Sequence, residues 1–393
     1  MQTEFLTSKD SPNSGSNITV SQIWSGKDCS ALRDIRVRRC DLQRFCTDVF
    51  LRLGLSETEG ADAAEILTAA DARGIPSHGV ARLERYITGI REGIMIPQAA
   101  AETVLDTPTS QVVDGQGGVG LHISRRVMQS TIRKAQHAGA AFAAVRNSNH
   151  FGIAGFYAMM ALPEDMIGVA MTNTAALGVP TFARDAFFGT NPIAAAVPAN
   201  TEVPFVLDMS TTVVTRGKIE THYREGELIP AEWAVDTEGH PTENAEKLLT
   251  AMTKQLGGGL LPLGGSGELT SGYKGYGLAV FVDILTGILS GGPFGRAVVD
   301  HEKTSGRVCH FFGAMRLDQF GDPETIKQNM DQLLHSLRTA APAQGQNRVY
   351  YAGLKEHLHE TNAAAMGIPL TKPVWHSLER IGRALTVQLP SRE

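Results

Sequence analysis

The sequence predicts an α/β protein with a helical region at its start. Apolar residues at helical spacing run through residues 38–73, and from about residue 102 to 300 short β-like runs alternate with helical segments. Hydrophobic residues make up 42% and charged residues 20% of the 393 residues. These proportions are typical of a globular chain, and the length suits two or three domains.

Residues 1–36 are polar and rich in Ser, Thr, Asn and Asp, which predicts a flexible N-terminal extension. The extension has no apolar segment of the kind found in secretory signals, and its acidic residues disfavour a transit peptide. Residues 37–101 are predicted to form a helical domain. Within it, Gly54 is expected to separate two helices.

A third helix is predicted to begin at Pro76-Ser77, because a serine can cap free backbone N–H groups. His78, Arg82 and Tyr86 then recur at i, i+4 and i+8. The apolar residues on roughly the opposite face would be Val80, Leu83, Ile87, Ile90 and Ile94. A proton carrier, a guanidinium and a phenol together suit a small organic acid, although a polar face that meets only water would have the same pattern.

The region 102–320 is predicted to hold the main sheet. Its β-like runs are 111–114, 141–145, 167–171, 194–197 and 204–207, and its clearest helical segments are 121–138 and 275–290. Residues 322–341 have the pattern of an amphipathic helix, and a closing helix is expected beyond residue 370. We expect the segment 321–393 to pack back on the N-terminal domain.

Gly115–Gly120 matches the G-x-G-x-x-G pattern of a Rossmann phosphate loop, after a β-like run and before a helix. The acidic residue expected about 20 residues later is absent from 135–145. Arg146 could instead meet a 2′-phosphate, which keeps an NADP version open. Because successive βαβ units are missing, the pattern favours a structural turn, with a Rossmann dehydrogenase as an alternative.

Polar segments at strand ends and helix starts carry the remaining candidate chemistry. They are 147–155, 172–174, 189–192, 206–212 and 272–277. His150 could move a proton, Asp208 could orient a histidine or hold a ribose hydroxyl, and Lys274 could contact a phosphate. Each also has a structural alternative: a histidine in a tight turn, an aspartate as a helix cap, and a solvated lysine.

Charge and cysteine content exclude several classes of partner. The net charge of −5 disfavours nucleic acid, and no apolar run is long enough to cross a membrane. Cys29, Cys40, Cys46 and Cys309 form neither a CxxC nor a zinc-binding pattern. They predict reduced thiols in the cytoplasm and no metal site.

Taken together, the motifs resemble the type 2 malate/L-lactate dehydrogenase family of NAD(P)-dependent oxidoreductases over about residues 37–370. The matching segments are 71–82, 147–155, 188–192, 207–211, 216–218 and 272–277. The resemblance implies a non-Rossmann fold, with a largely antiparallel nicotinamide-binding sheet beside a helical domain, and a homodimer with active sites near the subunit interface. The chain departs from the family at Tyr350–Leu354, where Ala352 and Leu354 replace the usual Pro and Glu.

The resemblance also implies roles for individual residues. His78 would be the proton donor, with Ser77 and Asp208 as its orienting partners, and Arg82 would bind the substrate carboxylate near Tyr86. In the family's ureidoglycolate enzymes the acid/base falls at the position of His150, so both histidines stay candidates and His78 is preferred. The implied cofactor contacts are His150, Phe151, Gly152, Ile153, Ala154, Thr174, Asp208, Met209, Ser210 and Lys274, with 306–310 as a further candidate.

The implied reaction transfers a hydride between NAD or NADP and a 2-hydroxy/2-keto acid pair. Malate/oxaloacetate is expected, because malate activity is widespread in the family; the alternatives are lactate, ureidoglycolate, sulfolactate or a cyclic imino acid. Since a neutral histidine would accept the hydroxyl proton, no metal is required. A non-catalytic NAD(P) sensor is disfavoured by the presence of Ser77, His78, Arg82, His150 and Asp208 together.

Overall fold

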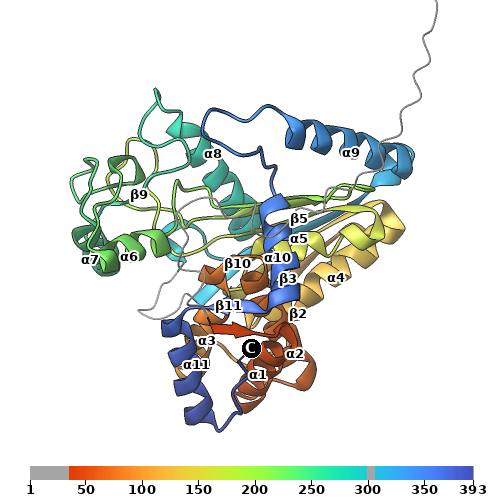
Figure 1. Ribbon diagram of the computed structural model, residues 1–393, viewed down its shortest axis with the longest axis horizontal. Helices are drawn as coiled ribbons and strands as arrows, with labels where there is room; N and C mark the ends of the chain where they lie inside the picture. The colour runs from red at the N-terminus through yellow and green to blue at the C-terminus, as the bar shows by residue number, and fades with distance from the viewer. Residues whose placement is uncertain (1–34, 299–305, 393) are drawn as a thin grey trace, which may run out of the picture.

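The computed structural model describes residues 35–298 and 306–392 (Figure 1). The predicted N-terminal extension therefore lies outside the described residues, except for its last two positions. Within the described ranges, none of the helices is long and apolar enough to cross a membrane.

A seven-stranded sheet forms the centre of the molecule, in the order β2-β3-β4-β10-β5-β6-β7. Its strands are β2 (Glu102–Asp106), β3 (Ser110–Asp114), β4 (Ala140–Asn149), β5 (Met166–Thr172), β6 (Ile193–Val197), β7 (Phe205–Met209) and β10 (Gly306–Arg316). Only β3 and β4 pair in parallel; all other neighbours are antiparallel. The predicted α/β fold with a largely antiparallel sheet is confirmed, while β2 and the central strand β10 were not predicted.

Helices from the middle of the chain contact this sheet. α4 (Gly120–Ala138) connects β3 to β4 and contacts β4 and β10, and α5 (Ala154–Met159) contacts β5 and β6. α8 (Gly272–Asp283) continues into a π-helical turn, Ile284–Ile288, that contacts β4 and β10. The predicted helix over 275–290 is therefore present, although its second half is π-helical.

The helical region near the start of the chain consists of α1 (Arg39–Arg52), α2 (Glu57–Ala72) and α3 (Leu83–Arg91). The break predicted at Gly54 is confirmed, and Ser56 and Glu59 form a capping box at the start of α2. α10 (Leu354–Met366) contacts α2, α11 (Lys372–Leu385) contacts α1, and β1 (Ile35–Val37) pairs with β11 (Ile368–Leu370). The exact domain boundaries stay a prediction.

A smaller group of elements forms a second apolar cluster at the upper left in Figure 1. It contains α6 (Arg216–Glu225), α7 (Ala245–Lys254), β8 (Ala234–Val235) and β9 (Gly259–Leu260). Ile219, Leu248 and Leu260 are buried in it. None of these elements was predicted from the sequence.

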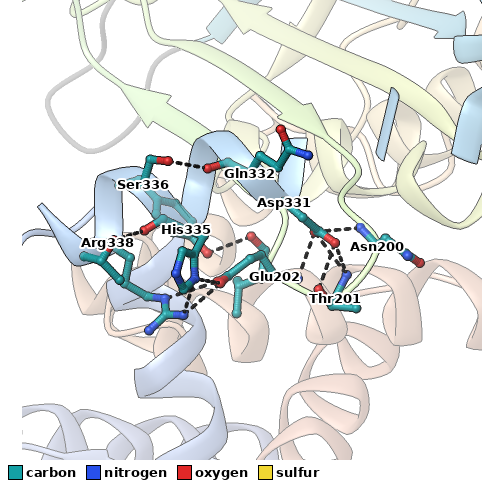
Figure 2. A network of polar contacts seen from close by, with 11 residues as sticks. Asn200, Thr201, Glu202, Asp331, Gln332, His335, Ser336 and Arg338 are labelled. Carbon is teal, nitrogen blue, oxygen red and sulfur yellow. Dashed lines mark hydrogen bonds and ion pairs between the residues drawn. The ribbon is translucent and has the colours of Figure 1, made fainter. Parts of the chain in front are cut away.

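The predicted amphipathic helix at 322–341 is confirmed as α9 (Pro323–Thr339), which lies against the turn between β6 and β7. Asp331 accepts hydrogen bonds from the backbone N–H groups of Asn200, Thr201 and Glu202 at 3.0 Å each. Glu202 in turn binds Arg338 at 2.8 Å and His335 at 3.3 Å (Figure 2). We call these six residues the α9 network.

Candidate active site

A small cavity lies where the ends of β4 and β5 meet the segment that precedes and begins α3. Three ionisable side chains line it: His78, Arg85 and His150. The other lining residues are Phe151, Gly152, Thr172, Asn173, Thr174, Thr190, Pro192 and Val308. The fold thus brings together the Ser-His-Gly segment and the segment after β4, as the sequence predicted.

The segment that carries His78 does not form the predicted helix. Pro76–His78 and Val80–Arg82 are separate 3₁₀ turns, α3 begins only at Leu83, and Ser77 caps no helix. The buried Asp71 carboxylate causes this interruption, because it accepts the Val80 N–H at 2.7 Å. Gly79 lies so close that a Cβ there would be 2.1 Å from Asp71. Desolvation raises the pKa of Asp71 to about 7.

His78 is held by its neighbour Ser77, whose Oγ lies 2.9 Å from Nδ1 of the ring. Desolvation, with smaller contributions from the positive charges of Arg82 and Arg85, lowers the pKa of His78 to about 4. The imidazole is therefore neutral near pH 7. Such a ring can accept a proton, and its protonated form is a strong acid.

His150 lies beside His78, with ring centroids 5.6 Å apart and nearly parallel planes. The hydroxyl of the fully buried Tyr86 is 2.6 Å from His150 Nδ1, and the Gly152 N–H donates to the same nitrogen at 3.4 Å. Because both neighbours can donate, we assign the proton of the neutral ring to Nε2. Burial holds the pKa of His150 well below its usual value, and Arg85 adds to this effect.

The two arginines of this segment lie differently from what the sequence predicted. Arg82 Nε donates to the Ser77 carbonyl at 2.7 Å, whereas Arg85 lines the cavity. Sequence reasoning missed Arg85 because it extended a 3.6-residue period from Ser77. The two 3₁₀ turns, with three residues per turn, change the phase. A second arginine three residues after Arg82 was the signal in the sequence that could have pointed to Arg85.

The predicted cofactor residues fall into separate groups. His150, Phe151, Gly152 and Thr174 line the cavity, and the backbone N–H of Thr190 donates to Thr174 Oγ1 at 3.1 Å. Ile153 and Ala154 are buried at the start of α5. Lys274 is exposed in the first turn of α8, with Nζ 5.9 Å from the Tyr273 ring centroid.

Asp208 lies at the end of β7, followed by Met209 and Ser210. Its Oδ2 accepts the Gly155 N–H at 2.7 Å, which links β7 to α5. The side chain reaches solvent, yet desolvation by the surrounding protein raises its pKa to about 6. Among the described hydrogen bonds none joins Asp208 to Ser77 or His78, so its place in a relay with His78 stays a prediction.

The segment 306–310, a further cofactor candidate, is the start of the central strand β10. His310 is fully buried: its two ring nitrogens lie 2.8 Å from Thr172 Oγ1 and Ser148 Oγ. The ring stacks on Phe151 at 4.5 Å, and burial lowers its pKa to about 3. His310 therefore supports the cavity wall from behind.

The Gly115–Gly120 pattern forms a structural turn between β3 and α4. Asn149 Nδ2 donates to the carbonyls of Gly117 and Gly118, and a Cβ at Gly120 would be 1.9 Å from the Asn149 carbonyl oxygen. Arg146 is paired with Asp114 at 2.9 Å. Because the surrounding sheet is largely antiparallel, the Rossmann alternative is wrong.

A mixed, largely antiparallel sheet with two neutral histidines and an arginine in one cavity is a non-Rossmann arrangement that can carry out acid–base chemistry on a small anion. The model of the malate/L-lactate dehydrogenase family matches residues 37–379. The chain belongs to this family of oxidoreductases.

Individual relatives agree with this membership. A malate dehydrogenase of Pyrococcus abyssi is 40% identical over 354 residues, which cover 90% of this chain and 96% of the relative. An L-sulfolactate dehydrogenase of Methanocaldococcus jannaschii is 35% identical over 305 residues, covering 77% and 84%. The crystal structure of malate dehydrogenase from Entamoeba histolytica superposes with a TM-score of 0.87 at 31% identity, covering 91% of this chain and 100% of that one.

Proposed function

We propose that this 2-hydroxy acid dehydrogenase interconverts malate and oxaloacetate with NAD or NADP. The observation that carries the proposal is the cavity itself, in which two neutral histidines stand beside a guanidinium. The names of the relatives support malate as the first substrate to test, and sulfolactate, which has a sulfonate in place of one carboxylate, as the second.

His78 is the proposed acid/base. With Nδ1 held by Ser77 Oγ, Nε2 is free to accept the proton of the substrate hydroxyl. In the reverse direction the imidazolium returns this proton to the keto oxygen, and the low pKa of His78 makes it a strong donor. The predicted partner of the carboxylate next to the reacting carbon is still Arg82, although Arg85 rather than Arg82 lines the cavity.

His150 is the second candidate for the same role. Its Nδ1 accepts a hydrogen bond from the Tyr86 hydroxyl, which fixes the ring. The Nε2–H group is then the one available to a substrate. In that arrangement Nε2–H can donate a hydrogen bond to the substrate oxygen, while His78 takes the proton. The two roles are separated by the single substitutions given in the Discussion.

The residues present fit a nicotinamide cofactor. Its binding residues would be the His150–Ala154 segment, Thr174 and the Asp208–Ser210 segment, with Lys274 toward a phosphate. The solvent-reaching Asp208 carboxylate, held by Gly155, suits a ribose hydroxyl. When bound, nicotinamide exchanges the hydride with the substrate.

A homodimer is the proposed assembly. α8 and the π-helical turn expose Leu278, Phe281, Ile284, Ile288 and Leu289, a large apolar surface for a solvated helix. A second copy of the chain is the proposed occupant, because this run of helix has no exposed charge after Lys274. Light scattering of the purified protein tests this, with Phe281→Glu expected to give monomers.

We also propose a cytoplasmic location, supported by the free, buried thiols of Cys46 and Cys309.

The activity is tested with a panel of 2-keto acids, each assayed with NADH and with NADPH. We expect oxaloacetate to have the highest kcat/KM. A higher kcat/KM for sulfopyruvate or pyruvate would replace malate with sulfolactate or lactate. Reduction of piperideine-2-carboxylate alone would make the protein an imino-acid reductase.

A further inference from the structure

We propose that His310, a fully buried residue of the central strand β10, is a positioning residue that sets the spacing between the His150 and Thr174 segments. His310 is not among the residues that line the cavity, so it acts through the two neighbouring strands rather than on a ligand. The inference rests on the proposed function, because it concerns how an acid–base candidate and a cofactor contact of that site are held relative to each other.

The ring of His310 joins β4 to β5. β10 lies between these strands, and the two ring nitrogens reach Ser148 Oγ on β4 and Thr172 Oγ1 on β5, both at 2.8 Å. Each partner comes two residues before a cavity residue. Ser148 precedes His150, and Thr172 precedes Thr174. The bridge therefore lies where both strands enter the site.

Backbone pairing alone leaves this end of β4 poorly defined. His310 pairs with Val145 of β4, and the next pair is Val308 with Ser148. Residues 146–147 of β4 thus face a single residue of β10, which is a bulge. On the other side, the regular ladder with β5 has its last pair at His310. A side-chain bond across the bulge supplies the spacing that the interrupted ladder cannot.

A neutral imidazole suits this bridge, because it donates one hydrogen bond and accepts another. Burial lowers the pKa of His310 to about 3, which keeps the ring neutral. The hydroxyls of Ser148 and Thr172 can each donate or accept, so both bonds form in either tautomer. The ring also stacks on Phe151, the residue after His150, with centroids 4.5 Å apart and parallel planes. One rigid ring thus contacts both segments.

The first test is His310→Phe, which keeps a buried ring against Phe151 but removes both hydrogen bonds. We expect kcat with oxaloacetate and NADH to fall by about 10–100-fold, since a small displacement within a site is costly. Thr131→Val is the matched control, because it removes a buried hydroxyl that binds Gln111 at 3.3 Å between α4 and β3. Both variants should have a lower Tm, but the control should keep the wild-type kcat and KM. A wild-type kcat in His310→Phe would overturn the proposal.

Two smaller changes test the bridge even if His310→Phe does not fold. The amide of His310→Asn can replace ring Nδ1 and keep the Thr172 bond, whereas the longer side chain of His310→Gln can replace Nε2 and keep the Ser148 bond. We expect the larger fall in kcat in His310→Asn, which frees the His150 segment. The larger rise in KM for NADH is expected in His310→Gln, which frees the Thr174 segment. Equal changes in the two variants, or none in either, would contradict a bridge between two strands.

Crystal structures of the wild type and of these variants separate the proposal from the activity itself. In His310→Phe the distance between the Cα atoms of His150 and Thr174 should change by more than about 0.5 Å, the tolerance of a preorganised site, and in Thr131→Val it should not. An unchanged distance in every His310 variant that folds refutes the positioning role, whatever the kinetics. A changed distance in a protein whose wild type reduces no 2-keto acid refutes only the proposed function.

Discussion

The cavity and the α9 network both combine histidine with arginine, yet their charges are arranged in opposite ways. In the α9 network Glu202 binds both Arg338 and His335, and Asp331 receives three backbone N–H groups (Figure 2). In the cavity, His78, Arg85 and His150 line a space with no carboxylate among its lining residues.

The pKa shifts differ in the same way. Hydrogen bonds and charge from Arg338 lower the pKa of Glu202, which keeps the pair ionised. Burial lowers the pKa of His78 and His150, which keeps both rings uncharged. A cluster that satisfies its own charges stabilises the fold, whereas neutral bases that line a cavity can act on a ligand. The predictions below test this contrast.

Replacement of the proposed acid/base should have the largest effect. His78→Asn should lower kcat by about 10²–10⁴-fold, because the variant cannot move the hydroxyl proton. His335→Asn in the α9 network should leave kcat unchanged. The kcat of each variant is measured from the change in NADH absorbance at saturating substrate. If His78→Asn turns over normally while His150→Asn does not, the acid/base is His150.

The 3₁₀ segment that holds His78 should be almost as sensitive. Gly79→Ala places a Cβ 2.1 Å from Asp71 Oδ1, so either the carboxylate or the turn must move. We expect a loss of about 1–3 kcal/mol in the free energy of unfolding, together with lower activity. Gly277→Ala is the matched stability control, since its Cβ would have no atom within 4 Å. Urea denaturation of both variants measures the difference, and equal stabilities would show that the contact relaxes freely.

Local patterns in the sequence predicted much of the fold but not its centre. Gly54 and the apolar periodicity located α1 and α2, because a helix-breaking glycine and an amphipathic face are local signals. The central strand β10 was missed because its identity depends on pairing with β4 and β5, which lie more than a hundred residues earlier in the chain. Pairing at such a distance leaves little local signal.

The site shows the same limit at smaller scale. His78 could be proposed from its Ser-His-Gly motif, and His150 from its place after a strand. Arg85 could not, because its orientation depends on a 3₁₀ turn that the buried Asp71 enforces through the Val80 N–H. The Asp71 side chain, nine residues before Val80, thus changes the helical phase on which the prediction of this segment relied.

The pH dependence of stability should also distinguish the two regions. The pKa of His78 is about 4 in the folded protein and 6.5 in the reference state, so the unfolded chain binds more protons between these values. His78 therefore lowers the free energy of unfolding as the pH falls from about 6.5 to 4.

Asp71, with its pKa raised to about 7, acts with the opposite sign, so the comparison must be between variants. As the pH falls from about 6.5 to 4, the free energy of unfolding of His78→Asn should decrease by about 1–3 kcal/mol less than that of the wild type. His335→Asn should follow the wild-type curve. Parallel curves for His78→Asn and the wild type would place His78 in a solvated environment.

A smaller effect is expected from the anchor of the α9 network. Asp331→Ala removes the acceptor of three backbone N–H groups in the β6–β7 turn, at a site open to water. We expect a loss of about 1 kcal/mol in stability with kcat and KM unchanged. Asp331→Asn, which keeps one acceptor oxygen, should lose less. A fall in kcat would connect this turn to the site and weaken the contrast.

The smallest effect should come from His335, at the exposed edge of the α9 network. Its Nδ1 lies 3.3 Å from Glu202 Oε1, but Glu202 keeps its closer partner Arg338 at 2.8 Å when the histidine is replaced. His335→Gln should therefore change the free energy of unfolding by less than about 0.5 kcal/mol, because exposed pairs contribute little and the Arg338 guanidinium remains. Repeating the measurement in Arg338→Ala sharpens the test, since His335 should contribute more once it is the remaining partner of Glu202. Equal effects in both backgrounds would mean that His335 and Arg338 act on Glu202 independently.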